Sequence, residues 1–105
     1  DVTAPARAAC VLPLGDSITQ GAKDRVSYRY WLWKTIQEAG VPVNFIGSTR
    51  GGFTGSPVYP DPNFDRDHEG HWGRRADEIL RDLPTWLMRY TPGIALVHLG
   101  SNDAF

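Results

Sequence analysis

The sequence has little of several features that mark other classes of protein. Cys10 is the only cysteine among 105 residues, so no disulfide can form within the chain. The apolar runs are far shorter than the roughly 20 residues that a membrane-spanning helix needs. The formal net charge is −1, so no excess of one sign favours nucleic acid or an anionic membrane. The sequence therefore predicts neither a disulfide scaffold, nor a membrane protein, nor a nucleic-acid binder.

What is present is an ordinary globular composition, with 41% hydrophobic and 22% charged residues. The chain starts at Asp1 without a Met or an apolar leader, which predicts a processed or trimmed chain. Cys10 opens an apolar run, so we expect a buried free thiol there; a bond to a cysteine outside the chain is the alternative.

Three strands and two helices are predicted. Residues 1–8 are small and polar and predict a loose arm. Residues 9–14 predict a buried strand, although Pro13 favours a strand end or edge. Ser27 is positioned to cap a helix over 28–39 that stops at Gly40, and residues 43–46 predict a second strand. The apolar stripe of that helix is Tyr28, Leu32, Ile36 and Ala39.

A stretch rich in Gly, Pro and Asp runs from residue 47 to 72 and predicts a long, functional loop. A helix over 75–90 follows, kinked or restarted at Pro84, and residues 94–99 predict the last strand. This order predicts an α/β fold, a flavodoxin-like parallel sheet with helices on both faces. The apolar face of the second helix is Ala76, Ile79, Leu80, Leu83, Leu87 and Tyr90.

Two of the predicted strands end in polar turns that contain glycine. Ser17 follows the first strand and Asn102 follows the last. Reactive groups gather at the carboxyl ends of parallel strands. A serine nucleophile needs a base for its proton and hydrogen-bond donors for the oxyanion. Taken alone, however, Gly-Asp-Ser is also an ordinary turn or helix cap.

Three sequence blocks together resemble the SGNH (GDSL-like) hydrolases. Residues 13–21, PLGDSITQG, are similar to the family's first block, and residues 99–103, LGSND, to its Gly-x-Asn-Asp block. Residues 67–73, DHEGHWG, are similar to the segment that holds its block glycine. The resemblance implies a three-layer α/β/α fold with Ser17 as nucleophile. It also implies an oxyanion hole made by the N–H groups of Ser17 and Gly73 and the side chain of Asn102.

Within that family, residues 28–33, 44–48 and 67–71 look most like the secreted carbohydrate esterases, which remove acetyl groups from xylan and similar sugars. The resemblance implies an extracellular serine esterase without a cofactor, acting on acetylated carbohydrate. The loop aromatics are candidates to stack on sugar rings, whereas Trp31, Trp33 and Trp86 on helices are expected in the core. The candidate substrate-binding residues are Asp16, Tyr59, His71 and Trp72.

The acid–base pair is missing from this pattern. The family carries it as Asp-x-x-His near the C-terminus, and no such motif follows Asn102 before the chain stops at Phe105. We expect His98 in the core, and His68 and His71 in structural or substrate-binding roles. Residues 1–105 are thus expected to be the N-terminal portion of one SGNH domain. Its partner would be the remainder, on a separate or missing segment, which supplies Asp-x-x-His and activates the enzyme.

Three other hypotheses compete with the esterase interpretation. The acidic loop over 61–71 faintly resembles a calcium loop, but Arg66 and Trp72 stand where Gly and Glu are needed, and the spacing of His68 and His71 is not that of zinc proteases. No metal is therefore expected. A catalytically inactive carbohydrate-binding module on the same fold is the main alternative. A nucleotide binder using residues 15–21 ranks last, because the glycine spacing and the phosphate-loop lysine are absent.

Overall fold

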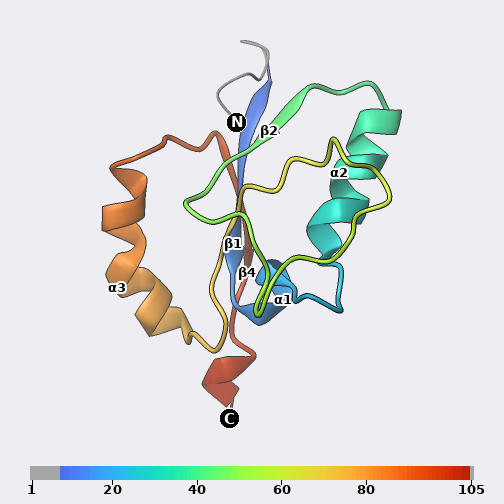
Figure 1. The fold of residues 1–105 in the computed structure, drawn as a ribbon. Coiled ribbons are helices and arrows are strands. Elements are labelled where there is room, and N and C mark those ends of the chain that lie inside the picture. The colour runs from blue at the N-terminus through green and yellow to red at the C-terminus, as the bar shows by residue number, and fades with distance from the viewer. Residues whose placement is uncertain (1–7, 105) are drawn as a thin grey trace.

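The computed structural model describes residues 8–104, arranged as a parallel sheet between helices (Figure 1). The predicted arm over 1–8 lies almost wholly outside the described residues. In chain order the elements are β1 (Ala9–Gly15), α1 (Ser17–Gln20), α2 (Tyr28–Glu38), β2 (Val43–Phe45), β3 (Glu69–Gly70), α3 (Ala76–Leu87), β4 (Ile94–His98) and the 3₁₀ turn η1 (Asn102–Ala104).

The sheet is built around β1, which pairs in parallel with all three other strands. β4 pairs along residues 11–15 of β1, whereas β2 pairs with residues 9–11 and β3 with residues 14 and 15. A strand has only two edges, so β2 and β3 share the edge opposite β4. The carboxyl ends of β1, β3 and β4 therefore meet at the same end of the sheet.

The shared edge explains how the central strand accepts a proline. On that edge, the carbonyls of Val11 and Gly15 accept hydrogen bonds from the N–H groups of Ile46 and His71. Pro13 lies between them, where β2 has ended and β3 has not begun. Its missing N–H costs no ladder bond there. The predicted strand is confirmed, and Pro13 occupies a position without a partner on that edge, as proline prefers.

Each face of the sheet carries one long helix (Figure 1). On the α2 side, Val11, Tyr30, Trp33 and Phe45 form a core with two aromatic rings from the long loop, Tyr59 and Phe64. On the α3 side, Leu12, Leu14, Ile46 and Ile79 form a second core. The alternation of Val11 and Leu12 between the two cores is the period of two that a strand imposes. The predicted parallel α/β fold is confirmed.

The helices differ from expectation in which residues they bury. The Ser27 side chain caps α2 as predicted, accepting from the N–H of Arg29 at 3.3 Å, but the most buried residues of α2 are Arg29, Tyr30 and Trp33 rather than the predicted stripe. Trp31 is 58% exposed, so its expected core position was wrong. Tyr30 and Trp33 pack against the rings from the loop, so these aromatic residues occupy the core in place of the predicted stripe.

α3 continues through Pro84 as one helix, so the predicted restart there was wrong, whereas the predicted kink stays a prediction. Of its predicted apolar face only Ile79 is buried, while Leu80 is 68% exposed. The adjacent strand β4 is also exposed, at 60% for Val97. Within residues 8–104 nothing pairs with the outer edge of β4, which leaves this side of the sheet and helix open. His98 ends β4 and is exposed, so its predicted core position was wrong.

Two further expectations were tested by the described residues. The stretch from 47 to 72 is not all loop, because its last residues form the two-residue strand β3, which carries no apolar signal. Cys10 is a free thiol but only half-buried. No helix within residues 8–104 combines the length and apolar character required to cross a bilayer.

Gly70 allows β3 to approach α1 closely, and this yields a stability prediction. A Cβ added at Gly70 would lie 2.6 Å from the backbone N of Gln20, where only backbone movement can relieve the clash. We expect Gly70→Ala to lower the free energy of unfolding by about 1–3 kcal/mol in urea titrations. Gly93→Ala is the control, because its Cβ would meet nothing closer than 3.6 Å. Equal losses in both variants would contradict the packing argument.

Candidate active site

The nucleophile candidate Ser17 is the first residue of α1, directly after β1. Ser17 is half-buried. Asp16 caps the helix by accepting from the N–H of Ile18 at 3.0 Å. Asp16 is 0% exposed, and its Oδ2 has no hydrogen-bond partner among residues 8–104. Asp16 thus acts as a helix cap, and its predicted role in substrate binding stays a prediction.

The carbonyls below Ser17 are held by a buried arginine. Arg29 is 0% exposed, and its Nε donates to the carbonyl of Thr19 at 2.7 Å. Its other nitrogens donate to the carbonyls of Gln20 at 3.1 Å and Arg66 at 3.0 Å. Burial lowers the pKa of Arg29 from its ordinary value, yet guanidinium groups stay charged in proteins. The cation satisfies the last carbonyls of α1, which the one-turn helix leaves unpaired.

Residues beside Arg29 complete this support. The Ser27 hydroxyl donates to the carbonyl of Thr19 at 2.8 Å, and the hydroxyls of Thr19 and Tyr28 lie 3.0 Å apart. Burial raises the pKa of Tyr28, which keeps its phenol protonated as a hydrogen-bonding group. Thr19 is fully buried. The turn that presents Ser17 is thus fixed from below by polar contacts rather than by apolar packing.

The candidate oxyanion glycine, Gly73, lies in the turn after β3. Its φ of 75° is in the region that glycine adopts readily. On one side, the N–H of Trp72 donates to Oε1 of Gln20, the last residue of α1, at 2.7 Å. On the other side, the carbonyl of Arg74 accepts from Nδ2 of Asn102 at 2.9 Å. The turn is therefore tied both to the nucleophile helix and to the end of β4.

The third oxyanion candidate, Asn102, begins η1 just beyond β4. Only one of its two amide hydrogens is needed for the bond to Arg74, so the other is available to a ligand. Asp103 accepts from the N–H of Ala76 with both oxygens, at 3.2 and 3.1 Å, and so fixes η1 to the start of α3. Neither Ser17 nor Gly73 donates its N–H to another residue within 8–104. Unpaired donors at one sheet end are what an oxyanion hole requires.

None of the histidines forms a hydrogen bond with the Ser17 hydroxyl among the described residues. His68 is 0% exposed; its Nδ1 accepts from the N–H of Gly70 at 2.9 Å, so Nε2 donates to the carbonyl of Gly51, also at 2.9 Å. Burial lowers the pKa of His68 to about 3. With both nitrogens occupied, His68 is structural.

His71 is occupied as well. Its Nε2 lies 2.6 Å from Oε1 of the buried Glu69, and its ring stacks on Trp86 of α3 with the centroids 4.5 Å apart. Burial alone raises the pKa of Glu69, but hydrogen bonds from His71, Ser48 and Tyr90 outweigh it and hold the pKa below its ordinary value. His71 is therefore a donor to a carboxylate and packs against a helix, away from a direct bond with Ser17.

The aromatic candidates separate clearly. Trp72 is 42% exposed and stacks on Phe53 with ring centroids 4.2 Å apart. The backbone N–H of Phe53 donates to the carbonyl of Gly21 at 2.9 Å, so this pair lies next to the end of α1. Tyr59 is only 7% exposed and stacks on Tyr30 in the core. The predicted role of Tyr59 in sugar binding was wrong, because the core already covers its ring.

The acidic loop uses its carboxylates internally. Asp61 accepts from Lys34 at 3.0 Å, and Asp65 accepts from the N–H of Phe45 at 2.9 Å. Within the described part of the chain, no three His, Cys, Asp or Glu side chains converge as metal ligands would. These contacts join the loop to α2 and β2.

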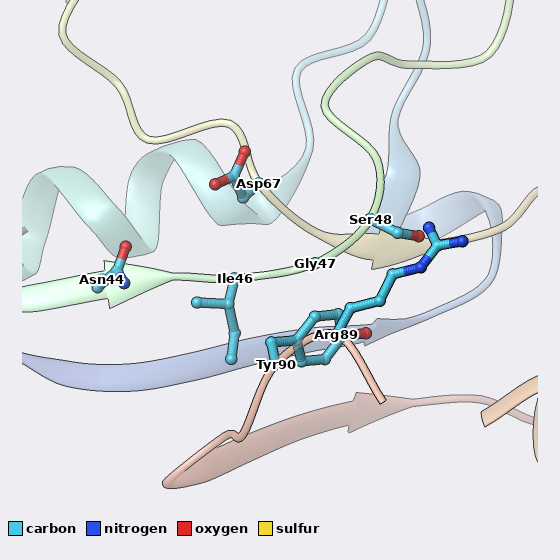
Figure 2. A pocket seen from close by; sticks show the side chains of 7 residues that line it. All are labelled: Asn44, Ile46, Gly47, Ser48, Asp67, Arg89 and Tyr90. Atoms are coloured by element: carbon cyan, nitrogen blue, oxygen red, sulfur yellow. The ribbon is translucent and has the colours of Figure 1, made fainter. Parts of the chain in front are cut away.

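A cavity of about 370 Å³ lies apart from the Ser17 turn (Figure 2). It is bounded by β2 with the segment after it and by the segment that precedes β4. Asn44 is 8% exposed there, and its Oδ1 lacks a hydrogen-bond partner within residues 8–104. The cavity is lined by Asn44, Ile46, Gly47, Ser48, Asp67, Arg89 and Tyr90.

Sequence reasoning missed three residues that shape the site: Arg29, Glu69 and Phe53. A charged residue on an amphipathic helix is normally solvated, so nothing in the pattern marked Arg29 as buried. Glu69 fell within an apparent loop. Phe53 had an available signal, since it is an aromatic residue directly after two glycines in the same loop as Trp72.

Burial of neutral His68 predicts a pH-dependent stability. The unfolded chain binds a proton near pH 6.5, whereas folded His68 does so only near pH 3. His68 therefore contributes full stability above pH 6.5 and lowers the free energy of unfolding as the pH falls toward 3. His68→Asn keeps an acceptor for Gly70. In urea titrations at pH 7 and 4.5, we expect the free energy of unfolding of His68→Asn to fall by about 1.4 kcal/mol less per pH unit than that of the wild type. Identical slopes would contradict a buried neutral imidazole.

Comparison with known proteins gives one curated relative and several solved structures. No known family profile matches the chain. A multidomain esterase from Ruminococcus flavefaciens is 29% identical over 112 residues, which cover 89% of this chain and 14% of the relative.

The solved structures are similar in both sequence and fold. A family 3 carbohydrate esterase from Clostridium thermocellum superposes with a TM-score of 0.76 at 32% identity, over 92% of this chain and 46% of its own. A family 3 carbohydrate esterase from Talaromyces cellulolyticus gives 0.75 at 35% identity, over 91% and 45%. A mutant acetyl esterase with an acetate ion gives 0.74 at 32% identity, also over 91% and 45%. The chain is thus similar to carbohydrate esterases of family 3 and spans slightly less than half the length of these structures.

Proposed function

We propose that the chain provides the nucleophile and the oxyanion hole of a serine esterase that removes acetyl groups from carbohydrate. The observation that carries the proposal is the shared position of three groups at one end of the sheet. Ser17 begins α1, the Gly73 turn is bonded to α1 through Gln20, and Asn102 is bonded to the same turn through Arg74. Relationship to carbohydrate and acetyl esterases supports this chemistry.

The reaction would proceed by double displacement. The Ser17 hydroxyl loses its proton to a base as its oxygen bonds to the ester carbonyl carbon, and the carbonyl oxygen becomes an oxyanion. The N–H groups of Ser17 and Gly73 and the free amide hydrogen of Asn102 stabilise that charge. Collapse expels the sugar hydroxyl, which takes the proton, and leaves an acetyl ester on Ser17. Water then attacks this ester and releases acetate.

The base belongs to a partner segment in this proposal. His68 and His71 are engaged in other contacts. His98 pairs with Gly15 at the end of β1 and its ring lies 6.4 Å from that of Tyr28, but it forms no hydrogen bond with Ser17 among residues 8–104. We propose that a segment outside residues 1–105 carries Asp-x-x-His and packs beside β4. The apolar surface of Ile94, Val97 and Leu80, which is exposed here, supports that placement. Such a segment would cover a sheet edge that isolated proteins rarely leave bare.

The exposed pair of Phe53 and Trp72 supports a carbohydrate substrate. The two stacked rings form an apolar ledge next to α1, and apolar ring faces suit the C–H face of a sugar. Acetylated polysaccharides lie outside cells, so the proposal includes an extracellular location. The same ledge would equally serve a catalytically inactive binding module, which is the second candidate.

A fluorophosphonate probe tests the nucleophile. In the full-length protein we expect the probe to label Ser17, and Ser17→Ala to abolish labelling and lower kcat for an acetyl ester at least about a thousandfold, as removal of a serine nucleophile does. Peptide mapping by tandem mass spectrometry locates the adduct, and acetate release measures turnover.

Ser56→Ala is the matched control for that test, because Ser56 lies in the long loop and forms no hydrogen bond among residues 8–104. It should keep labelling and turnover. Binding of acetylated oligosaccharide without labelling or turnover would instead identify an inactive binding module.

The Phe53–Trp72 ledge predicts a substrate-dependent effect. Trp72→Ala and Phe53→Ala should each raise KM for an acetylated oligosaccharide about tenfold, which corresponds to a stacking contact of roughly 1–2 kcal/mol. Their kcat/KM for p-nitrophenyl acetate, which has no sugar, should change less than about twofold. Val58→Ala is the control, since Val58 is an apolar residue of the same loop that is 94% exposed. Equal losses on both substrates would contradict a sugar-binding ledge.

A further inference from the structure

A cluster of buried hydrogen bonds within residues 8–104 converges on the Glu69 carboxylate. Glu69 is 0% exposed and carries four hydrogen bonds. Oε1 accepts from the Ser48 hydroxyl at 2.5 Å and from His71 Nε2 at 2.6 Å. Oε2 accepts from the Ser48 N–H at 2.9 Å and from the Tyr90 hydroxyl at 2.5 Å. We call Glu69, Ser48, His71 and Tyr90 the Glu69 cluster.

The cluster joins three segments that are far apart in the sequence. Ser48 follows β2, Tyr90 follows α3, and His71 follows β3. Only His71 belongs to the turn that carries Gly73, two residues further on. A carboxylate with four donors is ionised, and burial together with Glu69 raises the pKa of Tyr90, which keeps it a donor. Each of the three partners therefore gives a charge-assisted hydrogen bond.

His71 transmits this anchoring to the backbone of the turn. Its side chain is fixed between Glu69 and the Trp86 ring, and its N–H donates to the carbonyl of Gly15 at 2.9 Å. Gly15 is the last residue of β1, two positions before Ser17. Both the side chain and the main chain of His71 thus set where the next residues lie relative to the nucleophile.

We propose that Glu69 is a positioning residue that, through His71, holds the Gly73 N–H in line with Ser17. The proposal rests on the esterase function proposed above and adds residues to it that contact neither the substrate nor the reacting atoms. An oxyanion-hole donor must lie about 3 Å from the developing oxyanion, and loss of one donor costs about 10²–10³ in kcat. A displaced donor should cost part of that.

Two shape-matched substitutions separate positioning from simple stability. His71→Phe keeps a ring against Trp86 but removes one hydrogen bond to Glu69. Tyr90→Phe removes one hydrogen bond to the same carboxylate, from a segment outside the turn. In the full-length protein, we expect both to lower thermal stability similarly. Only His71→Phe should lower kcat for p-nitrophenyl acetate, by about tenfold with KM unchanged, because the loss falls on the transition state.

Glu69→Gln provides the coupling test. The glutamine side chain replaces one acceptor oxygen by an NH₂ donor, although all the partners of residue 69 are themselves donors. We therefore expect kcat to fall as it does in His71→Phe. The double variant Glu69→Gln/His71→Phe should have a kcat no lower than about that of the slower single variant. Both substitutions break the same connection from Glu69 to the Gly73 turn. Amide hydrogen exchange at residues 72–74 should speed up in Glu69→Gln and His71→Phe but not in Tyr90→Phe.

Three results would overturn the proposal: equal falls in kcat for His71→Phe and Tyr90→Phe, a raised KM with unchanged kcat in His71→Phe, or unchanged exchange at residues 72–74. The raised KM would make His71 a substrate-binding residue, as the sequence predicted. Hydrogen exchange does not depend on esterase activity. If Ser17→Ala retained full turnover, the esterase proposal would fail while exchange still tested the anchoring of the Gly73 turn.

Discussion

The Arg29 guanidinium is the contact on which the arrangement around Ser17 depends. It reaches from α2 through the core to the carbonyls of Thr19 and Gln20, and it also binds the carbonyl of Arg66 in the long loop. Its Cζ atom lies over the ring of Phe64, 5.6 Å from the ring centre. A one-turn helix has too few internal hydrogen bonds to persist alone. A fully buried cation that binds three carbonyls supplies what α1 lacks and ties the loop to the same point.

Polar contacts of this kind take the place of regular structure across much of the chain. β3 has only two residues, yet the side chain of its Glu69 holds three segments together. The neighbouring His68 donates to the carbonyl of Gly51 and so fixes the loop there. Such contacts are stabilising only when every donor and acceptor is matched, because an unpaired buried group costs more than a bond contributes. At the end of the sheet that bears Ser17, buried polar contacts hold the turn, and the N–H groups of Ser17 and Gly73 stay unpaired within residues 8–104. Preorganised donors in a rigid setting are the physical requirement for stabilising an oxyanion.

The sequence predicted β1, α2, β2, α3 and β4 and their parallel arrangement, because apolar runs, a Ser27 cap and a Gly40 stop are local signals. It also predicted that the ends of β1 and β4 meet, since that follows from topology. It could not predict β3 or the burial of Arg29 and Glu69, because these arise from contacts between distant segments. The difference in exposure between Trp72 and Tyr59 could not be predicted for the same reason. Both are aromatic residues of the loop, and only tertiary packing decides which of them enters the core.

The crystal structure of the full-length protein with a phosphonate bound at the nucleophile would test the central claim most directly. The account predicts a covalent bond from Ser17 Oγ to phosphorus. It also predicts a phosphoryl oxygen about 3 Å from three donors, the N–H groups of Ser17 and Gly73 and Nδ2 of Asn102. A phosphoryl oxygen directed away from Gly73 and Asn102, or a bond to another residue, would contradict it.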